Sequence, residues 1–232
     1  MKPLRAVFPI ITADRRLQYS RQFLGTGFFI DSEGTFLTAK HVLDGPELGK
    51  DEQLAGVIIP HGLKAYRILD VRYCEMFDIA IGRLEGAEDI DGLQLATGDP
   101  PMNRDVICVE FSGTSSEKLV DGHTAMVFHP YFRKGNIIAE YVSRYPEPVP
   151  TECFELSFPA LQGASGAPII VEMSGLVAGM VIANIERHLL PAQVERIDSP
   201  SGQTEEIRYF LPVGKALKWK HLREFVDSAH SV

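Results

Sequence analysis

Short runs of hydrophobic residues dominate the chain, and turns rich in glycine, proline, aspartate and serine separate them. Apolar runs of this length, rich in β-branched and aromatic residues, are typical of β-strands. The pattern predicts strands over residues 23–30, 35–39, 54–59, 66–73, 79–84, 106–111, 123–128, 136–142, 154–158, 168–172, 176–184 and 209–213. Short strands at such close spacing predict an all-β barrel or sandwich.

The middle and the end of the chain depart from this strand pattern. A cluster of turn-forming residues over residues 97–104 predicts a boundary between two units, residues 1–100 and residues 101–232. Residues 214–230 carry apolar side chains at roughly helical spacing, namely Ala216, Leu217, Leu222, Phe225 and Val226. This spacing predicts a C-terminal α-helix.

Other polar segments have simpler interpretations. Residues 195–206 are rich in charge, serine, proline and glycine, which predicts an exposed connection between two late strands. On the predicted tail helix we expect Trp219 to pack on a barrel. Solvated charges are expected there at Lys215, Lys218 and Lys220. We expect surface or packing roles for His61, His123 and His129.

Composition narrows the functional classes. Hydrophobic residues make up 45% and charged residues 23% of the 232 residues, as in an ordinary globular protein. The formal net charge is -8 and there is no long Lys/Arg cluster, so we expect no nucleic-acid partner. The chain contains no apolar stretch of bilayer length, and Pro9 interrupts a short apolar N-terminal segment. These features predict a cytoplasmic protein without a membrane partner.

The three cysteines do not suggest a metal centre or a disulfide framework. Cys74, Cys108 and Cys153 are odd in number and lack CxxC spacing, so we interpret them as buried free thiols.

The strongest candidate for chemistry is a serine between glycines. Ser165 lies in the segment Gln-Gly-Ala-Ser-Gly-Ala-Pro, which leads directly into a predicted strand. Glycine permits a tight backbone path, so the amides of Gly163 and Ser165 could converge on one point as an oxyanion hole. On its own, such a segment is better explained as a polar loop before a strand than as a catalytic motif.

Two upstream residues give this serine a context. His41 follows two predicted strands, with a small alanine two residues before it and a valine after it. Asp78 begins an apolar strand, where a carboxylate is costly unless it is hydrogen-bonded or paired. A base and an acid that orients it are the groups that a serine nucleophile requires.

Together these motifs resemble the trypsin-like serine peptidases, most closely the bacterial HtrA-like branch. In that branch TA-x-HV, D-x-A and GxSG-x-P occur in this order, as they do here around His41, Asp78 and Ser165. The resemblance implies a chymotrypsin-like fold of two six-stranded antiparallel β-barrels with a C-terminal helix. His41 and Asp78 would lie on the first barrel and Ser165 on the second.

The resemblance also implies how the site would work. His41 would act as the base, Asp78 would orient and stabilise it, and Ser165 would be the nucleophile, without a metal or a cofactor. The strand over residues 179–184 is similar to the segment that pairs with the substrate backbone in these enzymes. A substrate-binding role is therefore expected for Gln162, Ile182, Ala183 and Asn184.

The pocket for the side chain before the scissile bond would be formed by residues 158–162 and 182–185, which contain no charged side chain. The absence of charge favours substrates with a small or apolar side chain before the scissile bond. Two positions depart from the family pattern: alanine replaces the second glycine after the serine at Ala167, and Ala164 replaces the usual Asp or Asn. Trypsin-like zymogens mature when a freed N-terminal amine pairs with an aspartate just before the nucleophile. Ala164 stands at that position here, so this ion pair cannot form. The loop must therefore be ordered by local packing or by a regulatory protein partner.

Two other functions compete with the peptidase. An α/β-hydrolase nucleophile elbow would need glycine at position 167 and a helix after Ser165, whereas a strand is predicted there. A catalytically silent protease-like binding or scaffold module remains an alternative because fold does not fix function. Such modules usually lack a triad residue, and this chain has all three. The favoured prediction is a serine endopeptidase that acts on protein or peptide substrates.

Overall fold

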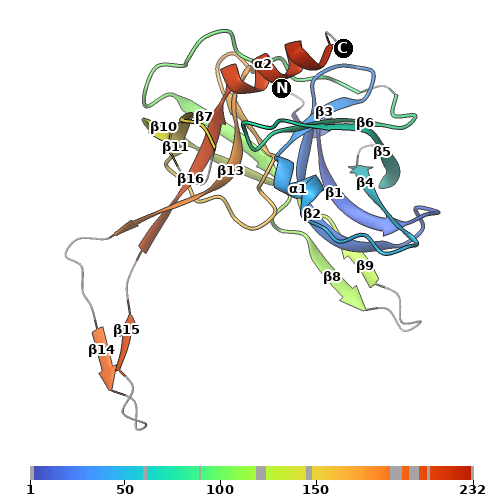
Figure 1. Cartoon of the computed structure of the whole chain (residues 1–232), viewed down its shortest axis with the longest axis horizontal. Coiled ribbons are helices and arrows are strands. Elements are labelled where there is room, and N and C mark those ends of the chain that lie inside the picture. Colours follow the sequence, from blue (N-terminus) through green and yellow to red (C-terminus); the bar gives the residue numbers. More distant parts are fainter. Residues whose placement is uncertain are drawn as a thin grey trace.

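The computed structural model describes residues 3–59, 62–88, 90–118, 124–144, 148–188, 195–198, 204–207 and 210–230. Its strands form two closed antiparallel barrels of six strands each, and helix α2 (Trp219–His230) follows the last of them (Figure 1). The prediction of an all-β fold with two six-stranded barrels and a C-terminal helix is confirmed.

The first barrel is built from the N-terminal part of the chain. Its strand order is β1-β2-β3-β6-β5-β4, with all neighbouring pairs antiparallel. These strands are β1 (Val7–Asp14), β2 (Ser20–Phe29), β3 (Thr35–Thr38), β4 (Glu52–Ile58), β5 (Lys64–Tyr73) and β6 (Ala80–Leu84). Aromatic rings fill its core: the centroid of the Phe8 ring lies 4.6 Å from that of Phe29 and 5.2 Å from that of Phe36.

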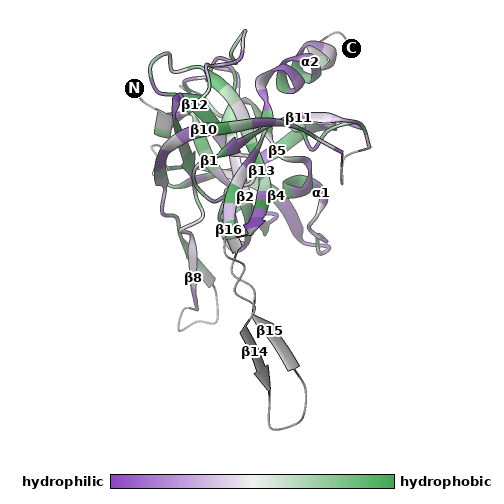
Figure 2. Ribbon diagram, turned by 90° about the vertical axis from the view of Figure 1, so that its left-hand side faces the viewer, coloured by the Kyte–Doolittle hydropathy of each residue, from purple (hydrophilic) through white to green (hydrophobic). Residues whose placement is uncertain are grey.

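The second barrel has the strand order β10-β11-β16-β13-β12-β7. Its strands are β7 (Asp105–Glu110), β10 (Tyr131–Ser143), β11 (Thr151–Leu156), β12 (Pro168–Val171), β13 (Val177–His188) and β16 (Phe210–Lys218). Buried apolar residues of both barrels and of α2 belong to one hydrophobic cluster, which includes Phe8, Met180 and Leu222. Burial of this shared apolar surface holds the barrels together. Figure 2 shows hydrophobic residues concentrated on the barrel strands, while α2 carries both hydrophobic and hydrophilic residues.

Two hairpins lie outside the barrels. One joins β8 (Ser115–Lys118) to β9 (Thr124–Val127), and the other joins β14 (Glu195–Asp198) to β15 (Thr204–Ile207). The second corresponds to the segment predicted to be an exposed connection, and its paired strands lie away from both barrels in Figure 1. In the part of the chain that the structure describes, no helix has the length and hydrophobicity needed to cross a bilayer.

The prediction for the start of the tail helix is wrong. Residues 214–218 belong to β16, which pairs with β11 on one side and with β13 on the other, and α2 begins only at Trp219. Barrel closure therefore outweighs the helical spacing of the apolar residues, as tertiary context often outweighs local propensity.

The prediction of solvated lysines at this end is also wrong for two of them. Lys215 and Lys218 are buried. The Lys218 ammonium donates to the carboxylates of Asp99 at 2.8 Å and Glu140 at 2.6 Å. Burial by itself would lower the pKa of Lys218, but these two ion pairs outweigh it and the pKa is raised. Trp219 Nε1 donates to the same Asp99 carboxylate at 2.8 Å, so this end of α2 is tied to the segment between the barrels.

One barrel strand was not predicted from the sequence. This strand is β1, which spans Val7–Asp14. Cys74, Cys108 and Cys153 are buried and none of them forms a disulfide, as predicted. Burial raises the pKa of the Cys108 thiol strongly, which keeps it in its unreactive form. His129 is exposed, whereas His61 and His123 lie outside the described residues.

Candidate active site

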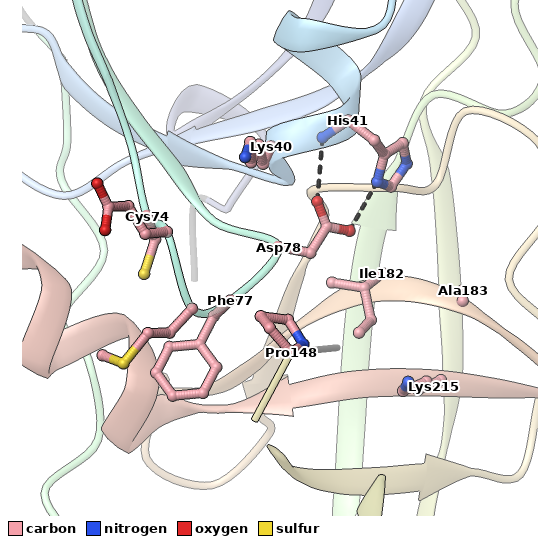
Figure 3. A pocket seen from close by; sticks show the side chains of 11 residues that line it. Lys40, His41, Cys74, Phe77, Asp78, Pro148, Ile182, Ala183 and Lys215 are labelled. Carbon is pink, nitrogen blue, oxygen red and sulfur yellow. Dashed lines mark hydrogen bonds and ion pairs between the residues drawn. The ribbon is translucent and has the colours of Figure 1, made fainter. Parts of the chain in front are cut away.

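His41 and Asp78 are joined by two hydrogen bonds. His41 is the second residue of the short helix α1 (Lys40–Asp44), which begins two residues after β3 ends. Its backbone N–H donates to Asp78 Oδ1 at 3.0 Å, and its ring Nδ1 lies 2.7 Å from Asp78 Oδ2 (Figure 3). A carboxylate with both oxygens engaged in this way fixes the position of the imidazole ring as well as its backbone.

Asp78 is presented by a tight turn before β6. The backbone N–H of Ile79 donates to Phe77 O at 2.8 Å, and that of Cys74 donates to Ile79 O at 2.9 Å. The side chain of Asp78 is 27% exposed and that of His41 is 49% exposed, so the pair faces solvent. The hydrogen bonds from His41 are the compensation that a carboxylate beside an apolar strand requires.

Ser165 lies on the loop that leads into β12. Its carbonyl accepts a hydrogen bond from the backbone N–H of Thr26 in β2 at 2.9 Å, so the loop is attached to the first barrel. A Cβ placed on Gly25 would lie 3.0 Å from Ser165 O and 2.8 Å from Cγ2 of Val42. The backbone of Ser165 and the residue after His41 therefore flank the same glycine.

The structure does not join all three predicted triad residues. Among the described residues, no hydrogen bond connects Ser165 to His41, so only the histidine and the aspartate are directly paired. Ser165 itself is half-buried.

The two glycines of the loop adopt backbone conformations that only glycine adopts readily. Gly163 has a φ of +94° and Gly166 a φ of +86°. Ala167, by contrast, is not among the residues with positive φ, and its N–H donates to Ala164 O at 2.9 Å. Alanine at position 167 therefore fits the loop without strain.

The predicted oxyanion donors are free. Within the described part of the chain, the backbone N–H groups of Gly163 and Ser165 donate to no other group, whereas those of Ala164, Gly166 and Ala167 are bonded. Free backbone amides on both sides of Ala164 leave this loop able to bind a developing negative charge.

A pocket of about 420 Å³ opens beside His41 and Asp78 (Figure 3). Its lining includes Phe77 from the Asp78 turn, Ile182 and Ala183 from β13, and Lys215 from β16. Ile182 is the extra residue of a bulge in the β13–β16 pairing, which is the kind of irregularity that redirects a side chain.

The four predicted substrate-binding residues have different surroundings. Ile182 and Ala183 line the pocket, and beyond Met180 β13 pairs with β16 but not with β12. The side chain of Asn184 crosses to the loop before Ser165: it accepts from the Ala160 N–H at 2.7 Å and donates to Ala160 O at 2.5 Å. Gln162 is exposed.

Two residues near the site were not predicted from the sequence. Lys215 lines the pocket and donates to Ser143 Oγ at 2.9 Å, whereas it was placed on a solvated helix. Thr26 contacts the Ser165 loop but was given no role. The available signal was a polar residue within an otherwise apolar strand, because such a residue must find a partner when buried. The described residues hold no group of three or more His, Cys, Asp or Glu side chains arranged to bind a metal.

Paired six-stranded barrels of this kind define the chymotrypsin-like class of fold. A family model for the trypsin-like peptidase domain matches residues 25–180, and the chain belongs to this family. The predicted resemblance to trypsin-like peptidases is thereby confirmed.

Solved structures of proteases share the fold at low sequence identity. The Rv3671c protease of M. tuberculosis in its active form is 19% identical with a TM-score of 0.60, over 93% of this chain and 77% of that one. The HtrA-type protease AlgW, solved with a decapeptide, is 14% identical with a TM-score of 0.64, over 99% of this chain and 66% of that one. A serine endoprotease from Yersinia pestis is 14% identical with a TM-score of 0.59, over 98% of this chain and 64% of that one. A comparison with curated proteins gives no match.

Proposed function

We propose that this protein is a serine endopeptidase that hydrolyses peptide bonds through Ser165, His41 and Asp78. The observation that carries the proposal is the double hydrogen bond from His41 to the Asp78 carboxylate. An ionised carboxylate only accepts hydrogen bonds, so His41 Nδ1 holds the proton and Nε2 is left as a base. Membership of the trypsin-like peptidase family supports this reaction.

The proposed reaction follows from these groups. Ser165 Oγ attacks the scissile carbonyl carbon while His41 Nε2 takes the hydroxyl proton. The carbonyl oxygen becomes an oxyanion that accepts hydrogen bonds from the free amides of Gly163 and Ser165. When the tetrahedral intermediate collapses, His41 gives its proton to the leaving amine and an acyl-enzyme remains. Water then attacks the acyl carbon while His41 Nε2 takes its proton. The bond between Ser165 Oγ and the acyl carbon breaks, and His41 returns the proton to Ser165 Oγ as the acid product leaves.

A polypeptide substrate suits the surroundings of the site. Residues 182–184 of β13 extend past the pairing with β12, which leaves a strand edge beside the pocket. An extended peptide binds to such an edge through its backbone and places alternate side chains in adjacent pockets. We therefore propose that the substrate backbone pairs with Ile182, Ala183 and Asn184.

The test compares turnover of an unstructured protein substrate by the wild type, Ser165→Ala, His41→Ala and the double variant. Each single change should reduce kcat by several orders of magnitude, with little further loss in the double variant, because the residues act as one unit. Asp44→Ala, an exposed change on α1, serves as a control that should retain turnover. Losses that multiplied in the double variant would contradict a shared nucleophile and base.

The missing hydrogen bond between Ser165 and His41 favours one alternative, a silent binding module. Catalytic hydrogen bonds often form only in the substrate complex, so this geometry is also that of a resting enzyme. The two functions differ in the wild-type result: a silent module binds the substrate and leaves it uncut.

A further inference from the structure

Thr26 of β2 is a completely buried polar residue at the junction of the two barrels. Its hydroxyl donates to Gly163 O at 2.8 Å, and its backbone N–H donates to Ser165 O at 2.9 Å. The same hydroxyl accepts from the backbone N–H of Phe111 at 3.3 Å. One residue of the first barrel therefore holds two carbonyl groups of the loop that carries Ser165.

Thr26 is also tied to the segment that carries His41. Its carbonyl accepts a hydrogen bond from the hydroxyl of Thr38 at 2.7 Å, and Thr38 is the last residue of β3, three positions before His41. The loop approaches both threonines closely. A Cβ on Gly166 would lie 2.1 Å from Thr26 O and 2.3 Å from Thr38 Oγ1.

This arrangement constrains the free amides of the loop. The carbonyls of Gly163 and Ser165 are bound to Thr26, while the N–H groups of the same two residues donate to no described group. The free N–H of Ser165 belongs to the peptide unit between Ala164 and Ser165, which lies between the two peptide units whose carbonyls Thr26 binds. The carbonyl of that unit, Ala164 O, accepts the N–H of Ala167 at 2.9 Å, so this amide keeps a constant direction. The free N–H of Gly163 belongs to the preceding peptide unit, which the bound carbonyl of Gly163 restrains on one side.

We propose that Thr26 is a positioning residue that holds the Ser165 loop in the conformation required to bind an oxyanion, and that it does so through its hydroxyl. The inference rests on the proposed peptidase function. Thr26 acts through Gly163 and Ser165 and does not touch the substrate. The backbone bond to Ser165 is available to any residue except proline, whereas the bond to Gly163 requires a hydroxyl at position 26.

Isosteric variants isolate this hydroxyl. Thr26→Val keeps the shape but leaves Gly163 O and the Phe111 N–H without their partner, whereas Thr26→Ser retains the hydroxyl. Thr151→Val is the matched control, because Thr151 is also fully buried and its hydroxyl also donates to a backbone carbonyl, Val149 O at 2.9 Å. Any general effect of losing a buried threonine hydroxyl should appear in that control too.

Thr26→Val should lower kcat by about 100-fold with little change in KM, because misplaced oxyanion donors weaken binding of the transition state more than of the substrate. Thr26→Ser should restore kcat close to the wild-type value, and Thr151→Val should retain it. Equal kcat in Thr26→Val and the wild type would overturn the proposal, as would equal losses in Thr26→Val and Thr151→Val.

Hydrogen exchange separates this inference from the proposed function. The amides of Ala164, Gly166 and Ala167 are bonded within or beside the loop, so their exchange reports its opening. They should exchange faster in Thr26→Val and at the wild-type rate in Thr26→Ser and Thr151→Val. Faster exchange in a protein whose wild type cuts no substrate would support the role of Thr26 and contradict the peptidase. Unchanged exchange in Thr26→Val would contradict the role of Thr26 whatever the activity.

Discussion

Asn184 connects β13 to the loop that precedes Ser165. Its amide binds both the N–H and the carbonyl of Ala160 in that loop. The strand and the loop are the two segments from which the sequence predicts the walls of the pocket for the side chain before the scissile bond. We expect a side chain that bridges these two segments to leave little room for a large substrate residue between them.

Replacing Asn184 should therefore broaden specificity. Asn184→Ala should raise kcat/KM for peptides with a large apolar residue before the scissile bond by about tenfold relative to those with alanine, a typical effect for one pocket contact. A peptide-library cleavage profile measures this ratio. Glu186→Ala, an exposed change on the same strand, serves as the control. The same profile in wild type and Asn184→Ala would show that the bridge does not limit the pocket.

Single residues also show what the sequence could reveal about the site. His41 and Asp78 were placed in one site from their motifs, and the structure joins them by hydrogen bonds. Thr26 could not be assigned in this way, because its partners lie 12, 85, 137 and 139 residues further along the chain. A strand pattern shows that a buried hydroxyl needs a partner, but only the packing of the barrels identifies it.

At the scale of elements, the sequence pattern missed one barrel strand, β1, and misplaced the boundary at the end of the chain. Short apolar runs located most of the barrel strands, because each strand must bury at least one face. The boundary between β16 and α2 is set by pairing with β11 and β13, which the local sequence does not encode. The existence of α2 was predicted correctly, while its start is five residues later than expected.

Helix α2 also carries a buried histidine that packs behind the candidate site. The ring of His221 lies 4.2 Å from that of Phe77, the residue before Asp78. Its Nε2 accepts the Glu152 N–H at 3.2 Å, and its Nδ1 is buried without a partner in the described structure. Burial lowers the pKa of His221. The nearby Lys220 and Lys218 lower it further, while Glu224 and Glu152 oppose this shift.

Because the folded-state pKa of His221 is depressed, the unfolded chain binds its proton more readily. The contribution of neutral His221 to the free energy of unfolding is fully present above the unfolded pKa of about 6.5. It is lost as pH falls toward the folded pKa, by at most about 1.4 kcal/mol per pH unit. The wild type should therefore lose more unfolding free energy than His221→Phe between about pH 7.5 and pH 5.5. Urea denaturation at both pH values measures this, and equal losses would show that His221 makes no such contribution.

At the scale of the whole molecule, the two barrels share one hydrophobic cluster and bring the segments of the proposed site to one junction. The first barrel carries His41 and Asp78, and the loop of the second carries Ser165. Ala164 is buried. It stands where trypsin-like zymogens have the aspartate that pairs with a freed N-terminal amine. The loop is instead bonded to Thr26 of the first barrel. We therefore expect the active conformation to form without N-terminal processing.

The most direct test of the account is to react the intact chain, beginning at Met1, with a fluorophosphonate probe and to locate the adduct by mass spectrometry. The probe should label Ser165 in the wild type without prior cleavage. His41→Ala should react far more slowly because the serine then lacks its base, and Ser165→Ala should give no adduct. An intact wild-type chain that acquires no adduct at Ser165, or acquires one only after cleavage ahead of Gly25, would contradict the account.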